Sequence, residues 1–228
     1  MLRPASSWLA EAWAVLAKDW RAEFRSRYAL STLLLFALTM LVVVTLALGP
    51  VGATPAQKLT VPPVVLWLIL LFAAASGVPR AFVHEEESRT AIALRLAATP
   101  SAVFVGKFAF VASLVAALEI VVTPLLLAVL QADVDRPATL VAVLAAGGFG
   151  LAAASTLVAA LVAQARGKGA LFAVLAFPIL VPLVLLAVEG TRAALGGPPA
   201  PEATGQLLLY DGSVTVASLM LFPAVWNP

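Results

Sequence analysis

Few side chains of this chain can do chemistry. Its 228 residues include no cysteine and a single histidine, His84. Thiolates and pairs of imidazoles are the side chains that most often hold zinc or haem iron, and a thiolate is a common nucleophile. The composition therefore excludes disulfides, thiolate metal sites and His–His haem ligation within one chain. We expect no catalytic residue, no metal site and no cofactor bound by this chain itself.

The carboxylates also lack the spacing of a catalytic site. Residues 85–87 are three consecutive glutamates in a polar stretch, where surface charge is their ordinary role. The basic turn at residues 166–169 (Arg-Gly-Lys-Gly) lacks the Gly-x-x-x-x-Gly-Lys-Ser/Thr pattern that binds nucleotide phosphates. The chain is thus predicted not to be an enzyme, and any ATP that drives it must be bound by a separate subunit.

Glu119 stands in the middle of a long apolar stretch. A charged carboxylate at that depth of a bilayer costs at least about 2.5 kcal/mol, so it should face protein or water, or be protonated. One interpretation is a polar point in a translocation path or a hydrogen bond that fixes helix pairing. The simpler interpretation is a neutral buried acid bonded to a neighbouring hydroxyl.

The elements that must position these residues are membrane-spanning helices. Of all residues, 62% are hydrophobic and 11% are charged, against about 25% charged in soluble domains. Each of six apolar segments reaches the length that crosses a bilayer at 1.5 Å per residue: 30–48, 62–78, 104–130, 138–163, 169–188 and 206–226. Pro62-Pro63 suits the opening turn of the second span, whereas Pro178 and Pro182 should bend or break the fifth.

Small residues in the fourth span suggest how it packs. Ala146, Gly150 and Ala154 recur every four residues, so they form one ridge along which another helix can approach closely. A contact between two copies of the chain would use such a ridge. Packing inside the bundle is the simpler interpretation.

The basic residues set the orientation of the chain. Cytoplasmic loops carry an excess of Lys and Arg. With a cytoplasmic N-terminus, eleven of the fourteen cations lie inside, and the outer loops hold only Lys58, Arg136 and Arg192. We therefore expect a multi-pass protein of the cytoplasmic (inner) membrane with both termini cytoplasmic. The cations form short clusters rather than a stripe, so nucleic acid is not an expected partner.

The N-terminal 28 residues predict an amphipathic helix rather than a span. Leu9, Trp13, Leu16, Trp20 and Phe24 fall within an arc of about 80° on a helical wheel, with charged residues opposite. We expect this helix to lie in the membrane interface, anchored in the lipid bilayer by Trp13, Trp20 and Phe24. Docking of a soluble amphipathic helix on a partner is the alternative.

The longest predicted cytoplasmic loop covers residues 79–103. A short helix is expected within it, because Glu85 and Arg89 have the i,i+4 spacing of an ion pair and Thr99-Pro100 should end a helix. Its mixed charged and apolar surface suits docking to a cytoplasmic protein, and a solvated connector is an equal alternative. The docking interpretation would use Phe82, His84, Glu85, Glu86, Glu87 and Arg89.

The order of these parts resembles that of ABC exporter permeases, and more narrowly the CcmB family of haem exporter B proteins. The similar segments are spread over residues 14–190. They are the basic and aromatic stretch 18–27, the segment 82–89, Thr99-Pro100-Ser101, Gly106-Lys107, 122–126, 167–169 and 177–183. The organisation predicted on this basis is an interfacial amphipathic helix over residues 1–28 and a six-span permease domain over residues 29–228, with a coupling helix in the loop 79–103.

The resemblance implies an all-α, six-helix ABC exporter-type permease that serves cytochrome c maturation. Its implied partners are an ABC ATPase subunit that binds ATP, a haem-handling membrane subunit, a small accessory membrane protein and a haem chaperone. We expect the chain to act as a homodimer within a complex that couples ATP hydrolysis to haem export or to release of haem from its chaperone. Two alternatives remain: an exporter permease for a drug, lipid or polysaccharide, and a membrane scaffold without a coupled transport cycle.

Overall fold

The structure, a computed structural model, describes residues 7–48, 54–87, 94, 97–164 and 168–226. This part of the chain forms seven helices and no strand. The helices are α1 (Trp8–Ser26), α2 (Tyr28–Leu48), α3 (Pro55–Glu87), α5 (Pro100–Val129), α6 (Pro137–Gln164), α7 (Lys168–Ala194) and α8 (Pro201–Trp226). All except α1 contain a stretch long and apolar enough to cross a membrane. The predicted all-α transmembrane fold with six spans is confirmed, and the chain is a multi-pass membrane protein.

The second spanning helix starts earlier than predicted. We expected it to open at Pro62-Pro63, but α3 begins at Pro55. Thr54 caps it, since its hydroxyl accepts a hydrogen bond from the backbone N–H of Gln57 at 3.4 Å. A proline suits the first turn because its φ is fixed near the helical value and the N–H that it lacks would have no partner there.

The other end of α3 extends past its expected limit as well. Its backbone stays helical through Pro79 and ends at Glu87, and α5 begins at Pro100. Residues 79–87 are therefore the last part of α3 and residues 100–103 the first part of α5, although we had placed both in the segment between two spans. Membrane helices tolerate an internal proline because neighbouring groups can satisfy the carbonyl that loses its partner.

Two prolines lie inside α7 without breaking it. Pro178 and Pro182 both fall within the continuous helix, although we considered a break at this point. A proline removes one bond of the helical ladder and crowds the carbonyls before it. In the same turn the carbonyl of Ile179 accepts a hydrogen bond from the hydroxyl of Tyr210 in α8, at 2.7 Å.

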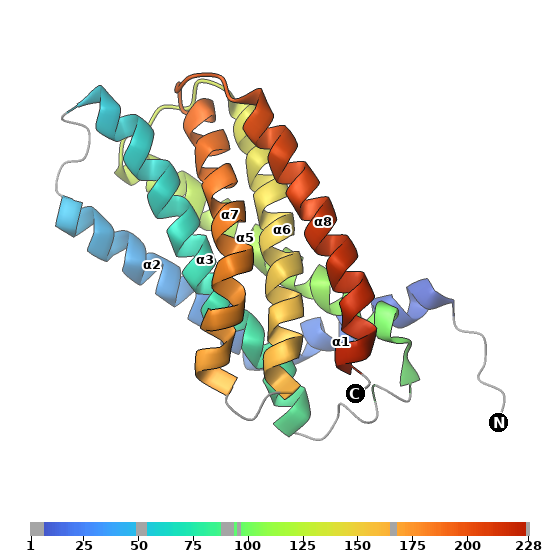
Figure 1. The fold of residues 1–228 in the computed structure, drawn as a ribbon. Helices are drawn as coiled ribbons and strands as arrows, with labels where there is room; N and C mark the ends of the chain where they lie inside the picture. Colours follow the sequence, from blue (N-terminus) through green and yellow to red (C-terminus); the bar gives the residue numbers. More distant parts are fainter. Residues whose placement is uncertain (1–6, 49–53, 88–93, 95–96, 165–167, 227–228) are drawn as a thin grey trace.

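α6 is the central helix, and α3, α5, α7 and α8 all pack against it (Figure 1). Its composition explains this place, because residues 137–164 contain no charged side chain and many small ones. Ala146 and Ala154 are buried, and Gly150 is enclosed by side chains of α7 and α8. The prediction that this ridge serves packing inside the bundle is confirmed.

α1 runs across the end of the bundle at which α5 begins and α8 ends (Figure 1). The helix starts after Ser7, whose hydroxyl accepts a hydrogen bond from the N–H of Ala10 at 3.3 Å. A single residue, Arg27, separates α1 from α2, and its φ of 52° places it in the left-handed region. That conformation turns the chain from the direction of α1 into that of α2.

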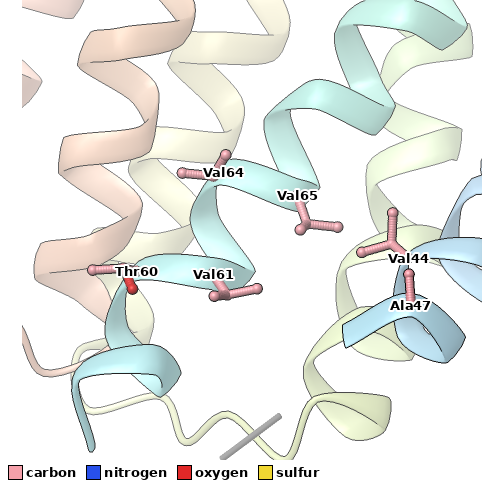
Figure 2. A pocket seen from close by; sticks show the side chains of 6 residues that line it. All are labelled: Val44, Ala47, Thr60, Val61, Val64 and Val65. Carbon is pink, nitrogen blue, oxygen red and sulfur yellow. The ribbon is translucent and has the colours of Figure 1, made fainter. Parts of the chain in front are cut away.

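α2 has few neighbours in the bundle. It contacts α3 and α5, and side chains such as Leu35 and Leu46 remain 70% and 78% exposed. Lipid must cover this surface in a bilayer. Toward their ends remote from α1, α2 and α3 diverge around an apolar groove of about 420 Å³ (Figure 2), which is lined by Val44, Ala47, Thr60, Val61, Val64 and Val65.

Candidate functional site

Three carboxylates of α1 hold this helix against its neighbours. Glu11, Asp19 and Glu23 are eight and four residues apart, so they share one face of the helix with Ala12 and Val15. This face, which we term the acidic face of α1, packs against α5. It lies about a third of a turn away from the aromatic arc, which we expected to lie in the membrane interface. Sequence reasoning did not predict its role.

Asp19 and Lys107 form a buried ion pair between α1 and α5. The Nζ atom of Lys107 lies 3.2 Å from Oδ2 of Asp19, and the lysine is only 1% exposed. Asp19 also lies 3.1 Å from Lys18, whose side chain is partly exposed. A buried charge without a partner is strongly unfavourable, so the pair fixes the register of α1 along α5.

Glu11 caps the start of α5. Its Oε2 atom accepts hydrogen bonds from the backbone N–H and the hydroxyl of Thr99, at 2.9 and 3.0 Å. Thr99 itself makes no side-chain cap, so the carboxylate from α1 takes that role. An anion at this position also interacts favourably with the positive end of the helix dipole. The indole of Trp8 adds a hydrogen bond to the hydroxyl of Ser101 at 3.0 Å.

Glu23 makes the equivalent contact with α2. Its Oε1 atom accepts a hydrogen bond from the N–H of Leu30, in the first turn of α2, at 2.8 Å. The acidic face of α1 therefore holds the first turns of two spanning helices that are separated by some 70 residues of sequence. α1 is therefore joined by an ion pair and by hydrogen bonds to the first two turns of α5 and by a hydrogen bond to the first turn of α2.

Gly106 lets α1 and α5 come this close. A Cβ atom at Gly106 would lie 2.6 Å from the carbonyl oxygen of Ala12 and 2.7 Å from Cβ of Val15. Both neighbours belong to the rigid part of α1, so any larger residue would push the helices apart. The tight contact sits one residue from Lys107 and brings it within reach of Asp19.

The three predicted membrane anchors have different surroundings. Trp13 and Phe24 are each 69% exposed, as an interfacial anchor requires. Trp20 is half-buried, with its ring 5.0 Å from that of Phe24 and 5.5 Å from that of Phe110 in α5. The aromatic arc thus has one edge against α5 and the other open, and its position in the interface stays a prediction.

For the predicted coupling residues, the structure describes the backbone of residues 82–87 only. Residues 82–87, which include Phe82, His84, Glu85, Glu86 and Glu87, form the last part of α3, but their side chains lie outside the described part of the structure. Arg89 lies outside it altogether. What the structure does place is the far end of this segment, because Thr99, held by Glu11, is where the segment joins α5.

Glu119 lies against the central helix. It is 8% exposed, and a Cβ atom at Gly148 would lie 2.6 Å from its Oε1 atom. Gly147 meets the ring of Trp67 from α3 in the same way, and Gly150 meets Asp211 from α8. Three neighbouring glycines of α6 therefore receive large side chains from three different helices. Among the described residues, the Oε1 atom of Glu119 has no hydrogen-bond partner. A bond between this acid and a neighbouring hydroxyl stays a prediction.

The described residues contain no group of three or more His, Asp or Glu side chains that could hold a metal ion. The acidic residues of α1 contact lysine side chains, the Thr99 hydroxyl and backbone N–H groups. These contacts join α1 to α5 and to α2.

A signal for the acidic face was present in the sequence. Lys107 is the only cation between residues 100 and 129, and a lone cation in an apolar helix needs a partner. Positions 11, 15, 19 and 23 repeat every four residues, and three of them are acidic. Pairing the two observations would have predicted that α1 docks through carboxylates.

Comparison with known proteins agrees with this architecture. The family model described as "CcmB protein" matches residues 10–226, which is nearly the whole chain. A relative from Bradyrhizobium diazoefficiens, "Heme exporter protein B", is 27% identical over 211 residues, and the match covers 92% of this chain and 92% of the relative. The matched range includes all seven helices almost completely. The chain belongs to the CcmB protein family.

Proposed function

We propose that this chain is the permease subunit of an ABC complex that serves cytochrome c maturation. A separate ATPase subunit hydrolyses ATP, and the permease converts that cycle into haem export or into release of haem from its chaperone. Membership of the CcmB family and the name of the relative, "Heme exporter protein B", support this proposal. A haem-handling membrane subunit, a small accessory membrane protein and a second copy of this chain complete the proposed complex.

The observation that carries the coupling role is the contact between Glu11 and Thr99. The segment that would receive force from the ATPase leads directly into Thr99, and the first turn of α5 is bonded there to α1. Asp19 and Glu23 extend the connection to Lys107 and to the start of α2. A displacement of the coupling segment therefore reaches α1, α2 and α5 together.

The chain's own residues favour transmission of movement over carriage of haem. Axial ligands of haem iron are usually histidine, methionine, cysteine or tyrosine. His84 is the only histidine, no cysteine is present, and the side chain of Met220 is 75% exposed on the lipid-facing surface of α8. A haem ligand pair from this chain alone is hard to assemble, so we place haem on the partner subunits.

The double substitution Glu85→Ala and Glu86→Ala is expected to weaken binding of the ATPase subunit. The two carboxylates lie near the end of α3, where we propose that the ATPase docks, and their loss removes charge from that surface. We expect a reduced yield of ATPase co-purified with the tagged permease, and a reduced level of mature cytochrome c in a deletion strain that carries this variant.

Glu202→Ala provides the matched control for that experiment. This exposed carboxylate is in the first turn of α8, at the opposite end of the bundle. ATPase recovery should not change. If the double variant also leaves ATPase recovery and activity unchanged, the docking site is wrong. If deletion of the gene leaves cytochrome c intact, the proposed function itself is wrong.

The proposed orientation places both termini in the cytoplasm of a cell with the chain in its inner membrane. Alkaline phosphatase, which is active only outside the cytoplasm, should be active when fused after Lys58 or after Arg192. The same reporter fused after Trp226 should be inactive. The reverse pattern of activity would place the α1 end of the bundle outside and remove the ATPase site from reach.

A further inference from the structure

Six described hydroxyl side chains of the spanning helices donate a hydrogen bond to the backbone carbonyl four residues earlier in their own helix, at distances between 2.6 and 2.9 Å. These residues are Thr39, Thr45, Thr60, Thr156, Thr191 and Ser213. This local bond is the usual way in which a serine or threonine hydroxyl finds a hydrogen-bond acceptor within a helix.

Four other hydroxyls make no such bond. Their buried oxygens have no hydrogen-bond partner within the part of the chain that the structure describes: Thr123, Ser155, Thr215 and Ser218. Three of these stand beside the two carboxylates of the bundle interior. Thr123 follows Glu119 by four residues, and Thr215 and Ser218 follow Asp211 by four and seven, so each set shares one face of its helix. Three of these four hydroxyls therefore lie on the same helix face as a buried carboxylate, one or two turns after it in the sequence.

Asp211 is the centre of the longer set. It is 3% exposed, and neither of its carboxylate oxygens has a partner among the described residues. A Cβ atom at Gly150 would lie 1.9 Å from Oδ1 of Asp211 and 2.4 Å from Cδ1 of Leu183. The carboxylate therefore fills the space that the glycine leaves open. A buried polar group without a hydrogen bond costs about 1–3 kcal/mol, so Asp211 needs a partner that the described residues do not supply.

The spacing along α8 fits water as that partner. The rise from Asp211 to Thr215 is about 6 Å and that from Thr215 to Ser218 about 4.5 Å. One water molecule that makes two hydrogen bonds bridges up to about 5.6 Å between polar atoms, and the side chains can lean to close the difference. Each gap therefore has the length of a single water bridge, and each water would have the two polar partners that a buried water requires.

The wall that α6 forms opposite this row of α8 consists of small residues. α6 and α8 lie side by side and run in the same direction (Figure 1). Gly150 faces Asp211, and one turn further along α6 comes Ala154, followed by the unpaired hydroxyl of Ser155. Beyond Ser218 the interior is closed by Phe222, which is fully buried and has its ring 5.2 Å from that of Phe104.

We propose that the seam between α6 and α8 holds a chain of water molecules that bridges Asp211, Thr215 and Ser218. The waters complete the hydrogen bonds of the carboxylate and of both hydroxyls inside the bilayer. Hydrogen bonds through water can also re-form after α6 and α8 shift slightly relative to each other. Interlocked apolar side chains would resist such a shift.

Hydroxyl-radical footprinting by X-ray radiolysis tests the proposal directly, because radicals formed from a trapped water oxidise the side chains beside it. The full chain would be irradiated in lipid nanodiscs, together with the subunits that co-purify with it. Leu183 is fully buried beside Asp211, whereas Leu185 on the same helix is 64% exposed toward lipid. We expect Leu183 to be oxidised several-fold faster than Leu185. Equal, low oxidation of the two leucines would overturn the proposal.

The double variant Thr215→Val and Ser218→Ala tests whether these hydroxyls hold the water. Valine has nearly the shape of threonine and alanine is smaller than serine, so the helix should still pack. Oxidation of Leu183 should fall toward that of Leu185. Unchanged rapid oxidation of Leu183 in this variant would also overturn the proposal, since the water would then be held by other groups. Ser213→Ala, which removes a hydroxyl bonded to its own helix, should leave the ratio as it is in the wild type.

Discussion

Gly147→Ala is expected to destabilise the folded chain by about 3 kcal/mol, the upper part of the range for an overpacked core. A Cβ atom at this position would lie 2.1 Å from Cη2 of Trp67 and 2.8 Å from two further ring atoms. The indole is fully buried, and its Nε1 donates a hydrogen bond to the hydroxyl of Thr191 at 2.9 Å. The ring is therefore held on both sides and cannot move away from the added methyl group.

The measurement is the thermal unfolding midpoint of the purified chain, with the monodisperse yield as a second readout. Gly212→Ala is the matched control, since a Cβ atom there would meet nothing within 4 Å. It should be neutral or stabilise the helix by up to about 1 kcal/mol. Trp67→Leu creates room, so its combination with Gly147→Ala should cost less than the sum of the two single changes. Equal midpoints for Gly147→Ala and Gly212→Ala would contradict the close packing around α6.

Asp19→Asn should cost about 3 kcal/mol, because it removes the carboxylate that lies 3.2 Å from the buried ammonium group of Lys107. α1 should then detach from α5, and protease sensitivity near residue 27 should rise along with a lower unfolding midpoint. Coupling should fail as well, since α1 no longer follows the first turns of α5. The level of mature cytochrome c measures that loss.

A double replacement separates the stabilising role of the pair from its role in coupling. Asp19→Leu with Lys107→Met removes both charges and should recover most of the stability, as apolar side chains can replace a buried ion pair. Glu189→Gln is the control, because the pair of Glu189 with Arg192 at 3.3 Å is exposed and should contribute less than about 1 kcal/mol. If Asp19→Asn behaves like Glu189→Gln, the ion pair does not hold α1.

Much of the architecture could be predicted from local sequence because the bilayer imposes it. Uninterrupted apolar stretches predict spans regardless of what packs beside them, and all six were found. The ends of the helices were harder. Pro62 and Pro79 would terminate helices in water, but in this bundle α3 continues through both, since its neighbours and the lipid leave no better conformation for the backbone.

The candidate site was harder to predict, because its contacts join residues that lie far apart in the sequence. Asp19 and Lys107 are separated by 88 residues, as are Glu11 and Thr99. The helical wheel of α1 suggested that the aromatic arc lies in the membrane interface and that Glu11 is on the opposite, charged face. The structure adds a contact that the wheel did not suggest, because the small and acidic residues of α1 allow a close approach to α5.

The exposure of α2 has a consequence for how the protein is made. α2 precedes the other five spanning helices in the sequence, it is the most apolar of the six, and residues 28–48 carry no charge. It can therefore reside in lipid while those five helices are synthesised. α8 is the least apolar of the six and is made after α6 and α7, which are then present to enclose Asp211. The helix that is stable in lipid by itself is thus made before the helix that needs protein neighbours around its buried carboxylate.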